Sequence, residues 1–185
     1  MTNIQVYDDI IPLPYQNQIH DKLHHDFEWK YFESIAYPKS YKVENDGSGF
    51  VGVIVPNPGQ TNFFNLLLPL VGIASYKYTG NEYLKTIFRM RAVMLLKDQY
   101  KGIGSSHIDM NEPHTTMIYY VNDSDGPTCF FDEDKKIIKQ VHPKKGRLVA
   151  FPGETFHAGY CPTKSNYRYL ININIETTQP LSIPF

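Results

Sequence analysis

Two histidines and one aspartate are the residues whose types and spacing could do chemistry in this sequence. His107 and Asp109 lie two positions apart, and a strand directs residues i and i+2 to the same face, so both can reach one metal ion. His157 lies far downstream and can complete the set if another strand carries it to the same place. Two imidazoles and a carboxylate leave three coordination positions open, which suits iron(II), whereas catalytic zinc sites usually keep one. The sequence therefore predicts an iron site at His107, Asp109 and His157.

A second His-x-Asp segment shows that such a pair is weak evidence alone. His24-His25-Asp26 falls where the periodicity predicts a helix, in which residues i and i+2 diverge by roughly 200°. That copy cannot chelate one ion. The histidines without a predicted role are interpreted as ordinary core or surface residues, and His114 as a bystander near the site: His20, His24, His25, His114 and His142.

Arg168 is a charge inside an apolar strand, Tyr167 to Ile175. An unpaired charge there would be expensive, so an anion should meet it. The partner is either a buried Asp or Glu, or the carboxylate of a bound co-substrate, which a guanidinium can bind through two hydrogen bonds. Counting by two from Arg168 places Leu170, Asn172 and Asn174 on its face. The other face holds Tyr169, Ile171, Ile173 and Ile175, which we expect to pack on helices. Such a strand fits a roll whose interior binds a ligand.

The elements that must position these residues are mostly short strands. Turn residues separate six of them, which are predicted at Arg89–Leu96, His114–Val121, Thr128–Phe131, Lys136–Val141, Arg147–Phe151 and Tyr167–Ile175. Many short strands at regular spacing are typical of a sandwich or jelly roll. Before them, the sequence predicts a strand within Asn3–Ile11, an amphipathic helix around Ile19, Leu23 and Phe27, a hairpin within Ser40–Val55, and a buried helix over Phe63–Tyr76, interrupted or bent near Pro69 and Gly72.

Size and composition set the limits of these interpretations. A chain of 185 residues is expected to form a single domain, 1–185, in which 1–87 supports a catalytic roll at 88–176 and 177–185 is a tail. The net charge of −1 gives no general attraction to nucleic acid or to anionic membranes. The two cysteines, Cys129 and Cys161, are expected to be reduced. Because no signal peptide is visible and the longest apolar run is too short to cross a bilayer, a cytoplasmic location is expected.

The ordered set of motifs resembles the 2-oxoglutarate/iron(II)-dependent dioxygenases, and within them the prolyl 4-hydroxylase-like branch. The segments that carry the likeness are His107-x-Asp109, Tyr119-Tyr120-Val121-Asn122, Pro143 to Phe151, His157 and Arg168, over roughly Phe88 to Glu176. The resemblance implies a mainly β fold with flanking helices, a double-stranded β-helix (jelly roll, cupin-like) preceded by N-terminal helices. It also implies that His107, Asp109 and His157 bind iron(II) and that Arg168 binds the C5 carboxylate of 2-oxoglutarate.

Three further residues are assigned to the co-substrate. The resemblance implies that Tyr120 hydrogen-bonds the same carboxylate and that Thr128 lines its pocket, while Asn172 faces it from the Arg168 strand. Two features depart from the family pattern. The turn before Thr128 lacks the common Gly-Gly form, and Arg168 stands where collagen-type enzymes usually have Lys, which brings the chain nearer to the oxygen-sensing kind. Residues Tyr100–Ser106 are a candidate lip, and Ser40–Gly59 is either a lid or an ordinary surface hairpin.

The implied activity is hydroxylation of an unactivated C–H bond, with iron(II), 2-oxoglutarate, O₂ and ascorbate, as a candidate reductant, taking part. A proline-containing peptide or protein is the expected substrate. Two alternatives remain open: a cupin-type metal-binding protein without oxidation activity, and an oxygenase that acts on nucleic acid or on a small metabolite. The hint for nucleic acid is a basic run, which a solvated hairpin explains more simply: Lys135, Lys136, Lys139, Lys144, Lys145 and Arg147.

Overall fold

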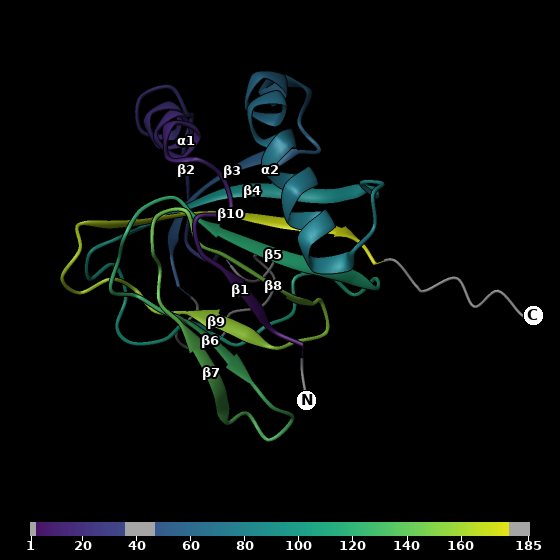
Figure 1. The fold of residues 1–185 in the computed structure, drawn as a ribbon. Coiled ribbons are helices and arrows are strands. Elements are labelled where there is room, and N and C mark those ends of the chain that lie inside the picture. Colours follow the sequence, from purple (N-terminus) through teal and green to yellow (C-terminus); the bar gives the residue numbers. More distant parts are fainter. Residues whose placement is uncertain (1–2, 36–46, 178–185) are drawn as a thin grey trace, which may run out of the picture.

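Two antiparallel sheets face each other, and two helices cover the outer face of the larger sheet (Figure 1). The computed structural model describes residues 3–35 and 47–177. Within them, the larger sheet has the strand order β1 (Gln5–Tyr7), β8 (Leu148–Pro152), β5 (His114–Tyr120), β10 (Tyr167–Glu176), β4 (Ile87–Leu96), β3 (Gly49–Val55) and β2 (Lys30–Phe32). The smaller sheet has the order β7 (Ile137–Val141), β6 (Thr128–Phe131) and β9 (His157–Gly159). This is a double-stranded β-helix, or jelly roll, and it confirms the predicted mainly β fold with helices before the roll.

Strand β10 lies in the middle of the larger sheet and separates the core from the interior of the roll. It pairs with β5 on one side and with β4 on the other, both antiparallel. Its residues Tyr169, Ile171, Ile173 and Ile175 are buried in one cluster with side chains of the helices. On the opposite face, Arg168, Leu170 and Asn172 line a cavity between the sheets. The predicted reversal, with polar residues inside the roll and apolar ones outside, is confirmed.

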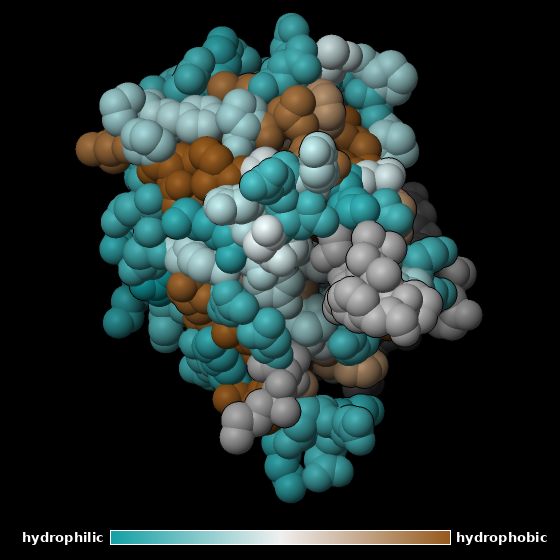
Figure 2. Space-filling view, turned by 45° about the vertical axis from the view of Figure 1, so that its right-hand side comes forward, coloured by the Kyte–Doolittle hydropathy of each residue, from teal (hydrophilic) through white to brown (hydrophobic). Residues whose placement is uncertain are grey.

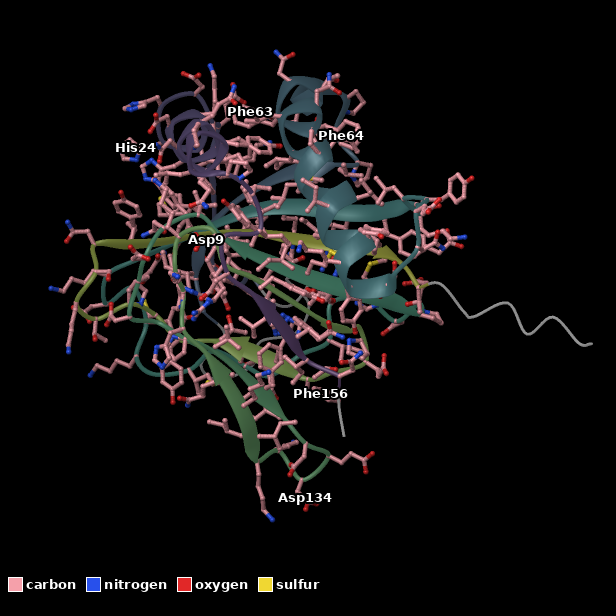
Figure 3. All side chains as sticks on the ribbon, in the orientation of Figure 1. Asp9, His24, Phe63, Phe64, Asp134 and Phe156 are labelled. Carbon is pink, nitrogen blue, oxygen red and sulfur yellow. The ribbon has the colours of Figure 1, made fainter. Side chains whose placement is uncertain are left out.

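The two helices form the other half of that core. Helix α1 (Leu13–His25) buries Ile19 and Leu23, as its stripe predicted, and α2 (Thr61–Thr79) follows a short 3₁₀ turn, η1 (Pro58–Gln60). Phe63 of α2 meets the ring of Phe27 edge to face, with 4.7 Å between centroids, and lies between the helices in Figure 3. These contacts fix both helices against the back of β10.

Helix α2 differs from its prediction in one respect. It runs without a break from Thr61 to Thr79 although Pro69 lies inside it, so the predicted interruption is wrong, whereas the alternative prediction of a bend near Pro69 and Gly72 stays a prediction. A proline removes one hydrogen bond of the helix, but burial of Leu67, Leu70 and Val71 on the sheet outweighs that loss. The helix ends at Gly80, whose positive φ of 70° closes the last turn.

The six predicted strands are all present, with ends that shift by one or two residues. Sequence reasoning missed β2 and β9, which are three residues long and too short to show an alternating pattern. The hairpin predicted within Ser40–Val55 has its second arm in β3. That arm pairs with β2, whereas most of the predicted first arm and its turn lie outside the described residues.

In the face shown by Figure 2, hydrophilic side chains cover most of the surface, and apolar side chains gather in the upper part and in smaller patches below it. None of the helices in the described ranges combines the length and apolarity that a bilayer crossing requires. Cys129 and Cys161 are both buried and free, in agreement with the predicted thiols.

Candidate metal and co-substrate site

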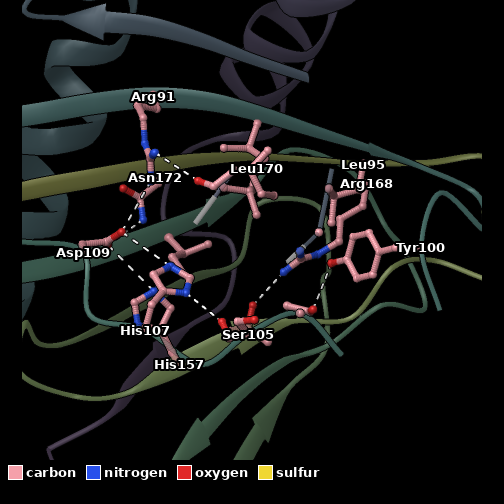
Figure 4. A pocket seen from close by; sticks show the side chains of 17 residues that line it. Arg91, Leu95, Tyr100, Ser105, His107, Asp109, His157, Arg168, Leu170 and Asn172 are labelled. Atoms are coloured by element: carbon pink, nitrogen blue, oxygen red, sulfur yellow. Dashed lines mark hydrogen bonds and ion pairs between the residues drawn. The ribbon is translucent and has the colours of Figure 1, made fainter. Parts of the chain in front are cut away.

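The backbone itself brings the two histidines of the predicted metal set together. His107 and His157 form an isolated antiparallel bridge in which each amide N–H donates to the other's carbonyl at 3.0 Å. Asp109 follows two residues later and points to the same place, so the side-chain ligand atoms of the three residues lie within 4.8 Å of one another (Figure 4). Among the described residues, this is the one group of three or more potential ligands at metal-binding distances.

Both imidazoles are held in the form that a metal needs. The Nδ1 atoms of His107 and His157 lie 3.0 Å and 3.1 Å from the carbonyl oxygens of Ser105 and Thr155. A carbonyl only accepts hydrogen bonds, so Nδ1 carries the proton in each ring and Nε2 keeps its lone pair. Burial, and then the neighbouring His157, lower the pKa of His107 to about 4, and burial lowers the pKa of His157 too. Both rings are therefore neutral at physiological pH.

Asp109 is oriented by a shell of donors. Its Oδ2 accepts hydrogen bonds from the amide groups of Asn172 at 2.9 Å and Asn174 at 3.0 Å. Its Oδ1 forms an ion pair with Nη2 of Arg89 at 2.7 Å. Burial alone would raise the pKa of this carboxyl, but its electrostatic interactions with His157, Arg91 and Arg89 outweigh burial and hold the pKa far below its usual value. The carboxylate is thus ionised at physiological pH, and its donors fix its direction.

Arg168 lies at the other end of the same cavity. The residue is 2% exposed, its Nη2 donates to Oγ1 of Thr128 at 2.7 Å, and its buried Nε has no hydrogen-bond partner among the described residues. The cavity wall contains one carboxylate among the described residues, Asp109, and that group is engaged elsewhere. The protein therefore offers Arg168 a neutral hydroxyl but, within the described residues, no anion.

Thr128 links Arg168 to Tyr120. The Tyr120 hydroxyl also donates to Oγ1 of Thr128, at 2.7 Å, so this oxygen accepts two hydrogen bonds. Its own proton is then available to an acceptor in the cavity, which Thr128 lines. Tyr120 is fully buried behind it, and the guanidinium carbon of Arg168 lies 5.7 Å from its ring centroid. Tyr120 is thus placed to support the anion-binding group through Thr128.

The rest of the cavity wall is largely apolar and includes the predicted lip. Val93, Leu95, Ile118 and Leu170 contribute apolar side chains, and Tyr100, Gly104 and Ser105 come from the segment Tyr100–Ser106. Gly159 closes the wall over Arg168, where an added Cβ would lie 2.8 Å from Nη1. Among the described residues of the predicted lid segment, Ser40–Gly59, Gly47 lines the cavity wall.

The structure brings most of the predicted site residues into one cavity and leaves the decoys outside it. Lining residues that were predicted are His107, Asp109, Thr128, His157, Arg168 and Asn172. His114 is buried away from the wall, its ring against Gly153, and His24 and His25 end α1 on the far side of the larger sheet. Sequence reasoning missed Arg89 and Arg91. The signal was available, because both are charges at alternate positions of an apolar strand, as Arg168 is.

A double-stranded β-helix that carries two histidines, one aspartate and a deep arginine in a single cavity is the arrangement expected of a mononuclear iron enzyme that uses an anionic co-substrate. Residues 97–176 match the family model of the 2OG-Fe(II) oxygenase superfamily, where 2OG stands for 2-oxoglutarate. This match and a fold like that of the prolyl 4-hydroxylases indicate a 2OG-Fe(II) oxygenase with iron(II) and 2-oxoglutarate as cofactors.

Solved structures with this fold belong to proteins with several different activities. A prolyl-4-hydroxylase of Pseudomonas putida is 12% identical, with 96% of this chain and 94% of that chain covered and a TM-score of 0.64. A prolyl hydroxylase of Trichoplax adhaerens, in complex with a peptide fragment of hypoxia inducible factor, is 14% identical, with 94% and 83% covered and a TM-score of 0.67. The 2-oxoglutarate-dependent epimerase SnoN of nogalamycin biosynthesis is 12% identical, with 100% and 81% covered and a TM-score of 0.67. At these identities the likeness shows the fold alone. No curated protein sequence matches the chain.

Proposed function

We propose that this enzyme hydroxylates an unactivated C–H bond of a prolyl or similar residue in a peptide or protein, with release of succinate and CO₂. The observation that carries the proposal is the content of one cavity. It holds a convergent His-Asp-His set at one end and, at the other, a buried guanidinium without a carboxylate partner among the described residues. Many proteins could contain such a metal set. The buried guanidinium restricts the class of protein to enzymes that also bind an anionic co-substrate.

The three metal ligands would be Nε2 of His107, Nε2 of His157 and one oxygen of Asp109. The donor set fits iron(II): two neutral imidazoles whose protons are fixed on Nδ1, and one carboxylate that stays ionised. Oδ2 of Asp109 accepts hydrogen bonds from two amides, and Oδ1 forms the 2.7 Å ion pair with Arg89. Asn172 and Asn174 set the plane of the carboxylate.

The co-substrate would enter with its C5 carboxylate toward Arg168. The buried Nε and the unused proton of Thr128 are donors in the cavity that fit such an anion. A carboxylate there would neutralise the buried charge, and each charge-assisted hydrogen bond would contribute roughly 1.5–3 kcal/mol. Tyr120 supports Thr128 from behind, and its direct contact with the carboxylate stays a prediction. Asn172 faces the same space and its Oδ1 has no partner among the described residues.

When bound, iron(II) and 2-oxoglutarate reduce O₂, with one oxygen atom going to the substrate C–H bond and the other to the succinate that forms as CO₂ leaves. The chain's own part is to hold the metal ligands in place and to exclude water from the cavity. The bridge between His107 and His157 keeps both rings in place without a ligand, and the apolar residues Val93, Leu95 and Ile118 keep water from the cavity. The lip around Tyr100, whose hydroxyl donates to the carbonyl of Gly159, borders the entrance.

The choice of a peptide substrate rests on similarity to prolyl hydroxylases, one of which was solved with a peptide. The second candidate is a small metabolite, favoured by the similar fold of SnoN from nogalamycin biosynthesis. Nucleic acid has weaker support. Four residues of the basic run bind the N-terminal part of this chain instead: Lys139 to the Ile4 carbonyl, Lys144 and Arg147 to Asp8, and Lys145 to Asn17.

The proposal is tested by reconstitution. The protein is loaded with iron(II) and 2-oxoglutarate without oxygen, and air is then admitted with a library of proline-containing peptides, with ascorbate present. Mass spectrometry should find one added oxygen in a subset of peptides, in step with succinate. A matched library with alanine at every proline should gain none. Succinate formed equally with both libraries, and no oxygen gained in either, would contradict a prolyl substrate, and the absence of any succinate would contradict the oxygenase assignment to these residues.

A further inference from the structure

Arg91 adds a second guanidinium to the cavity, beside the metal set. It lines the wall, and Figure 4 shows it above Asp109, on the opposite side of the cavity from Arg168, with Asn172 just below it and Leu170 between it and Arg168. Its hydrogen bonds are long: Nη2 is 3.5 Å from Oδ1 of Asp109, and Nη1 is 3.4 Å from the carbonyl oxygen of Ile35. Its Nε is buried and has no hydrogen-bond partner within the described residues. Arg91 is thus incompletely satisfied.

Arg89 explains why Asp109 does not satisfy Arg91. The two arginines lie at alternate positions of β4, on the same face, opposite Asn174 and Asn172 of β10. Arg89 takes the short ion pair with Asp109, 2.7 Å, and its Nε donates to Oδ1 of Asn174 at 2.9 Å. One carboxylate is therefore shared by two guanidiniums, and the guanidinium of Arg89 lies closer to it than that of Arg91.

A count of formal charges points to a further anion. The metal brings two positive charges and the guanidiniums of Arg89, Arg91 and Arg168 bring three. Asp109 and the two carboxylates of 2-oxoglutarate bring three negative charges. Even with the co-substrate in place, two positive charges stay unbalanced among the described residues in a site with a largely apolar wall, where such an excess is costly. A carboxylate on the substrate would reduce it.

We propose that Arg91 is a second carboxylate-binding group of the cavity, and that the substrate carries a carboxylate close to the C–H bond that is oxidised. The inference rests on the proposed function of this site and names its substrate class: an acid, such as a residue beside an acidic side chain or at a free C-terminus, in place of a neutral peptide segment. A planar guanidinium with a buried, unpartnered Nε is suited to grip a carboxylate through two parallel hydrogen bonds. The same chemistry could come from the C1 carboxylate of 2-oxoglutarate, so the experiment must separate the two sources.

The experiment measures binding without turnover. Protein loaded with Mn²⁺ and saturated with 2-oxoglutarate, free of oxygen, is titrated with N-acetyl-L-proline and with N-acetyl-L-prolinamide, a pair of equal shape in which one member is an anion. Line broadening of the acetyl methyl NMR signal by the bound Mn²⁺ reports both affinity and closeness to the metal. The acid should bind about tenfold or more tightly than the amide, as expected for charge-assisted hydrogen bonds.

Variants assign that preference to Arg91. Arg91→Gln should reduce the acid-to-amide ratio to within about twofold by weakening the acid alone, whereas Arg91→Lys, which keeps the charge, should retain part of it. Lys77→Gln, at an exposed position of α2, makes the same change in net charge and should leave the ratio unchanged. The affinity for 2-oxoglutarate, measured by calorimetry, should be the same in all four proteins.

Three results would overturn the inference. An unchanged ratio in both Arg91 variants would show that the acid binds elsewhere. A loss of 2-oxoglutarate affinity in Arg91→Gln, with the ratio intact, would assign Arg91 to the co-substrate. Failure of the wild-type protein to bind Mn²⁺ and 2-oxoglutarate would overturn the proposed function together with this inference, so the two failures are told apart by the wild-type titration.

Discussion

The two ends of the cavity contain opposite electrostatic situations. At the metal end, the buried carboxylate of Asp109 is surrounded by two amides and two guanidiniums. At the other end, the buried guanidinium of Arg168 meets a neutral hydroxyl and an aromatic face. At the metal end, several donors surround one anion. At the Arg168 end, a cation has no anionic partner among the described residues. The first is organised before any ligand arrives, whereas the second is completed only by a ligand.

Because of this difference, mutations at the two ends should change different affinities. Residues at the metal end hold a ligand atom in a fixed direction, so their loss should lower metal affinity. Residues at the Arg168 end compensate a charge only when the co-substrate is bound, so their loss should lower co-substrate affinity and leave the metal in place. Substitutions at five positions test that separation.

The largest effect is expected for Asp109→Ala. It removes the anionic ligand and leaves Arg89 and Arg91 facing the metal, so Mn²⁺ affinity should fall by at least about a hundredfold and succinate formation should be undetectable. Calorimetry without oxygen measures the first and a succinate assay the second. His157→Ala should abolish succinate as well. Asp134→Ala, at the exposed tip of the β6–β7 hairpin (Figure 3), is the control and should behave as wild type. Normal turnover by the Asp109→Ala protein would rule out the assignment.

Arg168→Ala should act on the other end alone. Loss of two charge-assisted hydrogen bonds should raise the dissociation constant of 2-oxoglutarate by a factor of about 10² or more, while Mn²⁺ affinity stays within about twofold. Titration of the Mn²⁺-loaded protein with 2-oxoglutarate measures this. Arg168→Lys keeps the charge without the planar fork and should fall between the two. A comparable loss of metal affinity would mean that the two ends are not independent.

Asn174→Ala sharpens the comparison at the metal end. This amide donates to Oδ2 of Asp109 and accepts from Nε of Arg89, so its removal frees the carboxylate to rotate. Mn²⁺ affinity should fall by about tenfold with little change in 2-oxoglutarate affinity relative to the metal-loaded protein. Asn62→Ala, at an exposed position of α2, is the matched control. Equal metal binding in the two variants would remove the supporting role from Asn174.

Gly159→Ala should have the smallest effect, at the Arg168 end. The new Cβ would lie 2.8 Å from Nη1, so the guanidinium must shift, which a flexible side chain can do at low cost. We expect the affinity for 2-oxoglutarate to fall by about three- to tenfold, which corresponds to roughly 1 kcal/mol. Gly72→Ala, whose Cβ would meet nothing within 4 Å, provides the control. An unchanged dissociation constant would show that Arg168 tolerates a second position.

The sequence predicted the convergent residues well because their signal is local. The i, i+2 spacing of His107 and Asp109 and the alternation along β10 are both short-range patterns, although His107 lies in an isolated bridge and not in one of the named strands. The supporting residues of Asp109 could not be found in this way. That Arg89 lies beside Asn174 depends on β4 being the neighbour of β10, which is a fact of topology that no local pattern encodes. The same limit explains why β9 was missed, since three residues carry His157 and yet show no periodicity.

Strand β10 serves the core with one face and the cavity with the other, and this restricts the insertions and deletions that it can tolerate. One face carries the hydrophobic core and the other carries Arg168, Leu170 and Asn172, so a single-residue deletion within it would turn isoleucines into the cavity and the arginine toward the helices. The protein would lose its stability and its proposed co-substrate site in one event. Length changes in β10 that preserve both can come only in steps of two residues, or as a bulge, and the one irregularity in its pairing with β4 lies near the end of the strand, at Asn174 and Ile175.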